Sequence, residues 1–285
     1  MKKIKKLSKK IIAIIIAACI IAVLLITCLG LQIAFMQADK IQCWRPNYEK
    51  LSSEEIYAIL DKEVLDYNDY AVLYMQTGLT KIGIDRALEY GSAGKSRILA
   101  IHDDFFAEHT VINDFFAPFV CQDTIDDKVN YIYLENGDIL VSSSTHISGW
   151  RAGHAGLVTN ANYSEVLQAS AVGSSSKVGY MYDFATRVNF MILSPKVDTD
   201  IKEQVVSFAL ENLVKKPYDP TAGVFSNKKS IDRTQCSHLV WSAYEKFGID
   251  LDSNGGLVVT PKDLANSPLV DVVQVFGLDP VKLWK

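Results

Sequence analysis

The strongest chemical signal in the sequence is Cys236, in the segment Thr234-Gln-Cys-Ser-His-Leu-Val-Trp-Ser-Ala-Tyr-Glu-Lys-Phe-Gly248. The apolar residues of this segment follow helical spacing, and Gly248 is placed to end the helix. Cys236 therefore lies in the first turn of a predicted helix, on its buried side. Unpaired backbone N–H groups and the positive end of the helix dipole favour a thiolate there. We expect a nucleophilic cysteine, and the alternative is a small buried apolar residue.

A nucleophilic thiol needs an imidazole within hydrogen-bond reach to take its proton. His154, in Gly153-His-Ala-Gly-Leu-Val158, opens a predicted strand between two glycines, which let a substrate or another backbone come close. The other histidines fall in an acidic aromatic stretch, in a Ser/Thr-rich loop or on the expected surface of the cysteine's helix: His102, His109, His146 and His238. His154 is therefore the predicted base.

Two residues compete to orient the imidazole. If the strand of His154 pairs with residues 163–169 through a loop at 160–162, His154 faces Gln168. The amide oxygen of Gln168 would then hold the ring, and Glu165 would point to the other face. Because a one-residue slip of register exchanges the two faces, Glu165 remains the alternative third residue.

The sequence gives no sign of a metal or an organic cofactor. No CxxC or His-x-His spacing of a structural zinc site occurs. The segment that ends in Gly94-Lys-Ser96 resembles a phosphate-binding loop, but Glu89 stands where that loop requires its first glycine. We therefore expect neither a nucleotide triphosphatase nor a metal centre.

The N-terminus carries the most apolar part of the chain. Residues 1–10 hold six lysines and no acid, and residues 11–36 contain no charged side chain. About 20 apolar residues are enough to cross a bilayer. A cleaved signal peptide, the competing interpretation, usually has an apolar core of about 7–15 residues and a small-x-small cleavage site. The lysines predict a cytoplasmic start, so everything after Ala38 would lie outside the cell.

Charge and cysteine content limit the function classes further. Without the six N-terminal lysines, 23 of the 29 basic side chains remain against 33 acidic ones, a formal net charge of −10. Nucleic acid is therefore not an expected partner, and no protein partner can be read from the sequence. Outside the cell, Cys43 and Cys121 could form a disulfide; the alternative is that all external cysteines are free.

The chain divides into four predicted parts. Residues 1–38 form the cytoplasmic start and membrane anchor, 39–51 a linker, 52–128 a helical preface and 129–285 the catalytic domain. A helix is expected to begin at Ser52 or Ser53, which can serve as an N-cap. A second helical stretch from 67 to 90 is interrupted near Thr77-Gly78.

After residue 129 the pattern changes to short β-rich runs separated by Gly, Asn and Ser. These runs cover residues 131–134, 138–141, 155–158, 166–169 and 188–193. Residues 201–215 and 237–247 return to helical spacing. This order predicts an α+β fold, with an antiparallel sheet or small barrel packed on helices.

Five short motifs occur in the order seen in circularly permuted NlpC-type cysteine hydrolases. They are Gly137-Asp-Ile-Leu140, Gly153-His-Ala-Gly-Leu-Val158, Val166-Leu-Gln-Ala169, Lys216-Pro-Tyr-Asp219 and Gln235-Cys-Ser-His-Leu-Val240. The chain resembles the YiiX-like branch of this papain-fold superfamily over residues 76–285. Ordinary members place the cysteine before the histidine, whereas the permuted branch has the histidine strand first, as here.

The resemblance implies that Cys236 is the nucleophile, His154 the base, Gln168 the third polar residue and Tyr218 a tyrosine on the substrate side. Glu is common at the third position of this branch. A Gln can orient the ring but cannot stabilise an imidazolium by charge. His238 also stands where an acid is common, and we expect it at the surface.

The combined expectation is a membrane-anchored, extracytoplasmic thiol hydrolase that cleaves amide bonds. By analogy with the family, its substrate would be peptidoglycan stem peptides. One alternative is a hydrolase or acyltransferase for lipids or N-acyl amides that uses the same residues. Another is an inactive anchored binding module. A large apolar cleft would favour lipid substrates, and a narrow cleft with acidic side chains would favour peptides.

Overall fold

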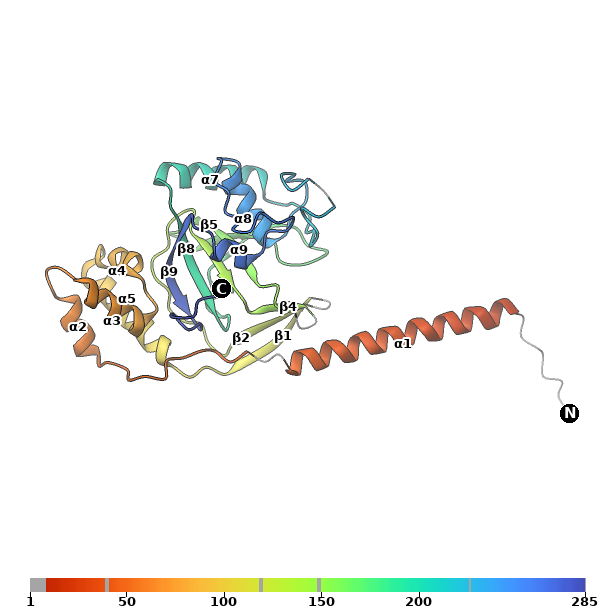
Figure 1. The fold of residues 1–285 in the computed structure, drawn as a ribbon, viewed down its shortest axis with the longest axis horizontal. Helices are drawn as coiled ribbons and strands as arrows, with labels where there is room; N and C mark the ends of the chain where they lie inside the picture. Colours follow the sequence, from red (N-terminus) through yellow and green to blue (C-terminus); the bar gives the residue numbers. More distant parts are fainter. Residues whose placement is uncertain (1–8, 39–40, 118–119, 148–149, 226, 285) are drawn as a thin grey trace.

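A computed structural model describes residues 9–38, 41–117, 120–147, 150–225 and 227–284. The first element, helix α1 (Lys9–Ala38), projects away from the rest of the molecule (Figure 1). Its section Lys9–Ile33 is long and apolar enough to cross a bilayer, and its large apolar side chains are exposed. These properties indicate the predicted membrane anchor.

Four helices follow as a group: α2 (Ser53–Leu60), α3 (Tyr67–Thr77), α4 (Lys81–Leu88) and α5 (Gly91–Phe106). Ser52 caps α2 through a reciprocal pair of hydrogen bonds with Glu55, which confirms the predicted helix start. Helix α3 ends at Gly78, whose φ of 70° is the left-handed conformation that glycine favours. The predicted interruption of the helical stretch is therefore confirmed.

The centre of the molecule is an antiparallel sheet of six strands in the order β7-β6-β5-β3-β8-β9. The strands are β3 (Ile139–Ser142), β5 (His154–Asn160), β6 (Glu165–Gln168), β7 (Lys177–Tyr180), β8 (Phe190–Pro195) and β9 (Val270–Phe276). The later helices are α6 (Tyr182–Ala185), α7 (Thr199–Asn212), α8 (Cys236–Glu245) and α9 (Pro261–Ala265). The architecture is the predicted α+β class with antiparallel sheets.

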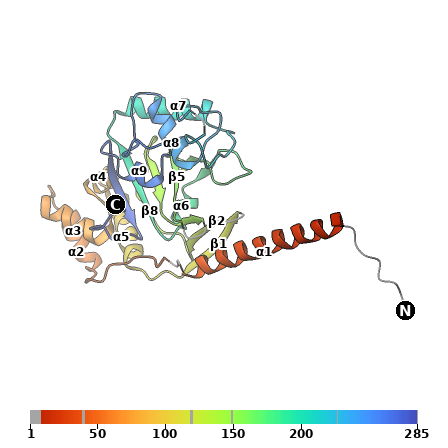
Figure 2. The same ribbon diagram turned by 45° about the vertical axis from the view of Figure 1, so that its right-hand side comes forward.

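The sheet is covered on both faces. Helices α7 and α8 lie over one face and helices α2–α5 lie on the other side, as the two views of Figures 1 and 2 agree. Neighbouring residues of β3 enter different cores, because Ile139 packs with residues of α7 and α8 whereas Leu140 packs with residues of α2–α5. Double burial explains why the central strands are nearly continuous apolar runs.

A second sheet corrects the predicted helical preface. Strands β1 (Val111–Ala117) and β2 (Val120–Ile125) pair with β4 (Thr145–Ile147) in the order β1-β2-β4. The helical part of the preface therefore ends at Phe106, and β1 and β2 follow it. In β2 half-buried and buried residues alternate, which is the period-two pattern of a strand covered on one face.

The prediction of a strand at residues 131–134 is wrong: this described segment forms neither a strand nor a helix. Its backbone is satisfied by a side chain instead of a strand: the N–H of Ile132 donates to Gln274 Oε1 at 2.7 Å. The same carboxamide donates to the carbonyl of Asn130 at 3.4 Å. Gln274 thus replaces the ladder partner that a strand would need.

Two further sequence alternatives are resolved. The segment that resembles a phosphate-binding loop lies within helix α5, where Lys95 pairs with Asp61 at 2.6 Å. Cys43 and Cys121 are both free thiols. Gln32 Nε2 of α1 donates to the sulfur of Cys121 at 3.3 Å, and burial together with Asp126 raises the pKa of Cys43 to about 12.

Candidate active site

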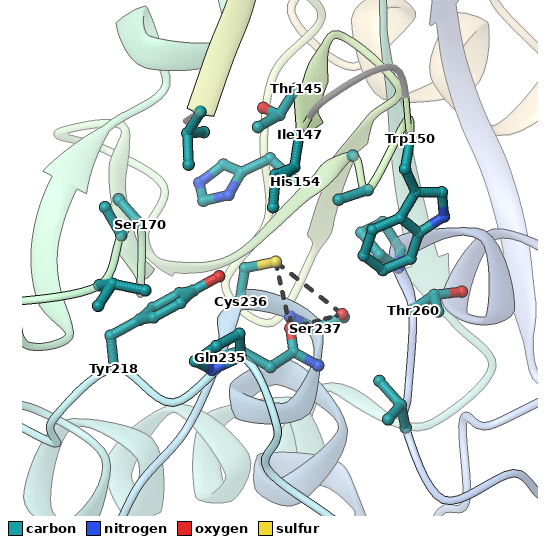
Figure 3. A pocket seen from close by; sticks show the side chains of 18 of the residues that line it. Thr145, Ile147, Trp150, His154, Ser170, Tyr218, Gln235, Cys236, Ser237 and Thr260 are labelled. Atoms are coloured by element: carbon teal, nitrogen blue, oxygen red, sulfur yellow. Dashed lines mark hydrogen bonds between the residues drawn. The ribbon is translucent and has the colours of Figure 1, made fainter. Parts of the chain in front are cut away.

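Cys236 is the first residue of α8, at the place the sequence predicts. The side chain of Gln235 caps the helix by accepting from the N–H of Ser237 at 2.9 Å. The thiol of Cys236 donates to the same oxygen, Gln235 Oε1, at 3.3 Å, and its sulfur lies 3.9 Å from Ser237 Oγ (Figure 3). The nucleophile candidate is thus held at the buried start of a helix.

His154 is the first residue of β5, directly opposite Ser142 of β3. Its ring is buried and stacks on Phe184, with 5.4 Å between the ring centroids. The residue before it must be glycine, because Gly153 has a φ of 71° and a Cβ there would lie 2.7 Å from the carbonyl oxygen of Ser142. The close approach of the Gly153 backbone to the Ser142 carbonyl therefore fixes the position of the His154 ring.

Gln168 is the residue that the structure brings to the imidazole. His154 Nε2 and Gln168 Oε1 are 2.7 Å apart. The predicted hairpin register was wrong by two residues, since Leu157 pairs with Leu167 and a bulge follows Val158. A shift of two keeps every side chain on its predicted face, so the expected contact still forms. Glu165 pairs with Asn160 at the turn end of the hairpin.

Sequence reasoning missed two charged residues behind this contact. Gln168 Nε2 donates to Asp183 Oδ2 at 2.6 Å. Arg187, four positions later, donates to the hydroxyls of Ser144 and Thr145 at 2.9 and 2.8 Å and is 3% exposed. The four-residue spacing of an acid and a base was visible in the sequence, but nothing there indicated that β6 lies beside them.

Burial controls the protonation of both reactive groups. It raises the pKa of the Cys236 thiol, and hydrogen bonds from the Ala155 backbone and Ser237 offset this only in part. Burial, followed by the charge of Arg187, lowers the pKa of His154 to about 3. The predicted thiolate at the helix start is therefore corrected, because desolvation outweighs the helix terminus and leaves a neutral thiol beside a neutral imidazole.

The thiol and the imidazole face one cavity of about 320 Å³ (Figure 3). Its described lining contains no Asp, Glu, Lys or Arg. Most of the lining is apolar and includes Val120, Ile147, Trp150, Val172, Val259 and Pro261. Trp150 and Val172 are 63% and 68% exposed, so the cavity has an apolar, solvent-exposed edge.

Tyr218 lies at the same cavity with its hydroxyl directed toward the sulfur of Cys236 (Figure 3). A backbone bridge joins Tyr218 to Thr234, two residues before the cysteine. Burial, and to a smaller extent Cys236, raises the pKa of the Tyr218 hydroxyl. The tyrosine is therefore a neutral hydrogen-bond donor beside the thiol.

The remaining histidines lie outside this cavity. His238 was wrongly predicted at the surface: it is buried and bonds Thr234 Oγ1 at 2.9 Å and the carbonyl of Lys228 at 2.7 Å. His146, predicted in a loop, lies in β4 beside Asp123. Within the described part of the chain, no group of three or more His, Cys, Asp or Glu side chains could hold a metal ion.

The chain is similar to a curated protein, the uncharacterized protein YycO of Bacillus subtilis strain 168. The two are 45% identical over 58 residues, which is 19% of this chain and 24% of that protein. The match therefore spans about a quarter of the length of the relative. No protein-family model and no solved structure matches the chain.

Proposed function

We propose that this protein is a membrane-anchored thiol hydrolase in which Cys236 is the nucleophile and His154 the base. One observation carries the proposal: the two residues, 82 positions apart in the sequence, meet at one cavity. Gln168 holds the far nitrogen of the ring, which leaves Nδ1 for the thiol. Nucleophilic catalysis by a cysteine requires such a base within reach of the thiol.

The reaction would start from the neutral pair. His154 Nδ1 takes the proton of the Cys236 thiol while the sulfur attacks the carbonyl carbon of an amide. The C–N bond then breaks, and the imidazolium returns the proton to the leaving amine. Water attacks the resulting thioester, with His154 again as base, and releases the acid and the free thiol. The overall change is amide plus water to acid plus amine.

Two donors are suitably placed for the oxyanion of the tetrahedral intermediate. The N–H of Cys236 lies in the first turn of α8, and the hydroxyl of Tyr218 points to the sulfur (Figure 3). The N–H of Ser237 is already bound to Gln235 Oε1. Donors fixed beside the reacting atom stabilise the developing charge without reorganisation.

The cavity lining favours an apolar acyl group as the substrate part that binds beside Cys236. The described lining lacks the acidic side chains that would pair with the free amine of a stem peptide. A lipid or an N-acyl amide suits this surface better. Peptidoglycan peptides, which the resemblance implies, remain the competing substrate class.

The chain order supports a permuted papain-like arrangement, since the strand of His154 precedes the helix of Cys236 and the two pack together. The lysine-rich N-terminus supports an orientation with this domain outside the cell. Both assignments belong to the proposal. Protease accessibility of the domain in intact cells would test the orientation.

An inactive binding module is the second candidate, and one observation favours it. The Cys236 thiol forms hydrogen bonds with Gln235, Ser237 and the Ala155 backbone, and the imidazole forms one with Gln168. A direct thiol–imidazole bond would have to form when a substrate binds. Such tightening on binding is common in hydrolases, so the resting geometry does not exclude catalysis.

The deciding experiment uses the full chain in detergent. Amides of one chromogenic amine with acyl groups from acetyl to dodecanoyl, and a set of cell-wall peptides, would be compared for wild type, Cys236→Ala and His154→Ala. Hydrolysis that rises with acyl length and disappears in both variants is the expected result. Cleavage of the cell-wall peptides alone would assign the other substrate class.

The control for inactivity needs no substrate. Iodoacetamide labelling of Cys236, measured by peptide mass spectrometry, should be slower in His154→Ala, because burial disfavours a free thiolate and the base must assist. Equal labelling rates in wild type and His154→Ala, together with no hydrolysis, would indicate the binding module.

A further inference from the structure

The carboxylate of Asp183 contacts Gln168, which in turn contacts the imidazole of His154. We infer that Asp183 is a positioning residue that fixes which nitrogen of His154 carries the proton, acting through the side-chain amide of Gln168. This inference rests on the proposed function, because the tautomer matters only if His154 serves as a base.

The argument begins with the direction of two hydrogen bonds. Asp183 Oδ2 lies 2.6 Å from Gln168 Nε2, and Gln168 Oε1 lies 2.7 Å from His154 Nε2. A carboxylate can only accept, so it must face the NH₂ end of the amide. The oxygen end then faces the ring and also can only accept. His154 Nε2 must therefore carry the proton.

The consequence lies at the other ring nitrogen. A neutral imidazole carries one proton, so a proton on Nε2 leaves Nδ1 with a free lone pair. His154 is neutral at ordinary pH because burial and Arg187 lower its pKa to about 3. In the opposite amide orientation, the NH₂ of Gln168 would face the ring, and the proton would move to Nδ1. Such an imidazole could not accept the proton of Cys236.

The surroundings hold the amide in place. Gln168 is 2% exposed, and its strand pairs with β7, where a Cβ at Gly179 would lie 2.5 Å from Gln168 Nε2 and 2.9 Å from Asp183 Oδ2. Only a residue without a side chain leaves room there for the contact between the amide and the carboxylate. Gly179 therefore contributes to holding the amide of Gln168 in this orientation.

Charge is a smaller influence than hydrogen-bond direction here. Asp183 itself is exposed, so solvent screens its charge. Two cations lie beside the chain of contacts: Arg187 donates to the Asp183 carbonyl at 2.9 Å, and Lys177 lies opposite Gln168 on β7. Asp183 supplies an acceptor at a defined place, which these cations cannot do.

The first test is the tautomer itself, by nitrogen-15 NMR of the full chain with labelled histidine in detergent. The signal of His154 is assigned from its absence in His154→Ala. We expect the proton on Nε2 in the wild type. A wild-type proton on Nδ1 would overturn the inference, and this readout needs no substrate.

The second test exchanges the two groups. Asp183→Asn should give a mixture of tautomers and slow the iodoacetamide labelling of Cys236 by roughly 3- to 10-fold, the range of one hydrogen bond. Gln168→Glu combined with Asp183→Asn puts the carboxylate directly against Nε2, and labelling should return to within about threefold of wild type. A purely structural role would not be rescued by this exchange.

The control variant is Asp200→Asn, an exposed acid at the start of α7, which should change neither readout. If Asp183→Asn folds and keeps the wild-type tautomer and labelling rate, the inference is wrong. If the Nε2 tautomer is confirmed but Cys236→Ala and His154→Ala change no hydrolysis, the proposed function fails while the positioning remains. The two failures are therefore distinguishable.

Discussion

Two polar clusters in this molecule differ in the charge of their members and in what they border. In the first, the terminal nitrogens of Arg86 bind Asp138 at 2.6 and 3.1 Å and Glu135 at 2.8 Å, and Lys202 binds the same Glu135. In the second, Cys236 and His154 are neutral and border a cavity.

The first cluster has a structural role, whereas the second is the candidate reactive site. The Arg86 cluster joins α4, α7 and the segment before β3, and its opposite charges satisfy one another. The hydrogen bonds from Gln168 to His154 and from Gln168 to Asp183 hold the ring, and the proposed mechanism assigns Nδ1 of the ring to the thiol. Burial and polarity alone do not mark a candidate site; two neutral reactive groups that border one cavity distinguish the second cluster from the first.

The largest expected effect lies in the second cluster. Cys236→Ala and His154→Ala should each lower kcat/KM for acyl amide hydrolysis by a factor on the order of 10³ or more, because each removes a group that takes part in bond making or proton transfer. Arg86→Met should leave kcat/KM of the folded fraction within about threefold of wild type. Steady-state hydrolysis assays measure both. A comparable loss of activity in Arg86→Met would erase the distinction between the clusters.

The next effect lies in the first cluster and concerns stability. Arg86→Met leaves the fully buried Asp138 without its closest cation and should lower the free energy of unfolding by about 3–5 kcal/mol. Its matched control is Lys81→Met on the same helix, where the pair with Asp85 is exposed and should contribute little to the free energy of unfolding. Urea unfolding of the two variants measures the difference. Equal losses would mean that burial does not distinguish these ion pairs.

A smaller effect tests the apolar cavity. Trp150→Ala should lower kcat/KM for dodecanoyl amides by roughly 5- to 30-fold, since an apolar contact of about 1–2 kcal/mol is lost. Acetyl amides should be affected far less, because a short acyl group does not reach the cavity edge. A panel of acyl lengths measures the slope. Equal losses for short and long acyl groups would place the acyl chain elsewhere.

The last prediction concerns the change of stability with pH. Burial lowers the pKa of His102 to about 4, of His154 to about 3, and of His238 below its usual value. In the unfolded chain these histidines bind protons near pH 6.5. Their contribution to the free energy of unfolding is therefore fully present above that pH and is lost as the pH decreases toward 4. His102 and His154 each contribute a slope of up to about 1.4 kcal/mol per pH unit, and His238 adds to it in the same direction.

Urea unfolding at several pH values measures this slope. His102→Gln should reduce it by up to about one proton, with no change in the pH dependence of Cys236 labelling. Stability that is constant between pH 6.5 and 4.5 would mean that these histidines are protonated in the folded protein. It would also remove the neutral imidazole on which the mechanism depends.

Local signals were sufficient for part of this structure. The start of α8 at Cys236, the strand that begins at His154 and the cap at Ser52 follow from residue types within a few positions. The contact of Gln168 with His154 was also accessible, because side-chain alternation survives a register error of two residues. These features depend on sequence neighbours or on parity alone.

Other features depend on contacts between distant segments. Asp183 lies on a single helical turn that gains its meaning only when β6 is placed beside it. Buried His238 forms a hydrogen bond with the carbonyl of Lys228, which is ten positions away in the sequence. The neutral state of Cys236 results from its burial by segments that are distant in the sequence. Sequence periodicity contains none of these distances, so their prediction needs the fold.

Strand β2 links the anchor to the cavity. Its Cys121 accepts a hydrogen bond from Gln32 of α1, and its first residue, Val120, lines the cavity. A reactant dissolved in the bilayer would therefore reach Cys236 by lateral diffusion within the membrane. Its turnover would follow the mole fraction of reactant in the membrane and fall when inert lipid is added at constant total amount.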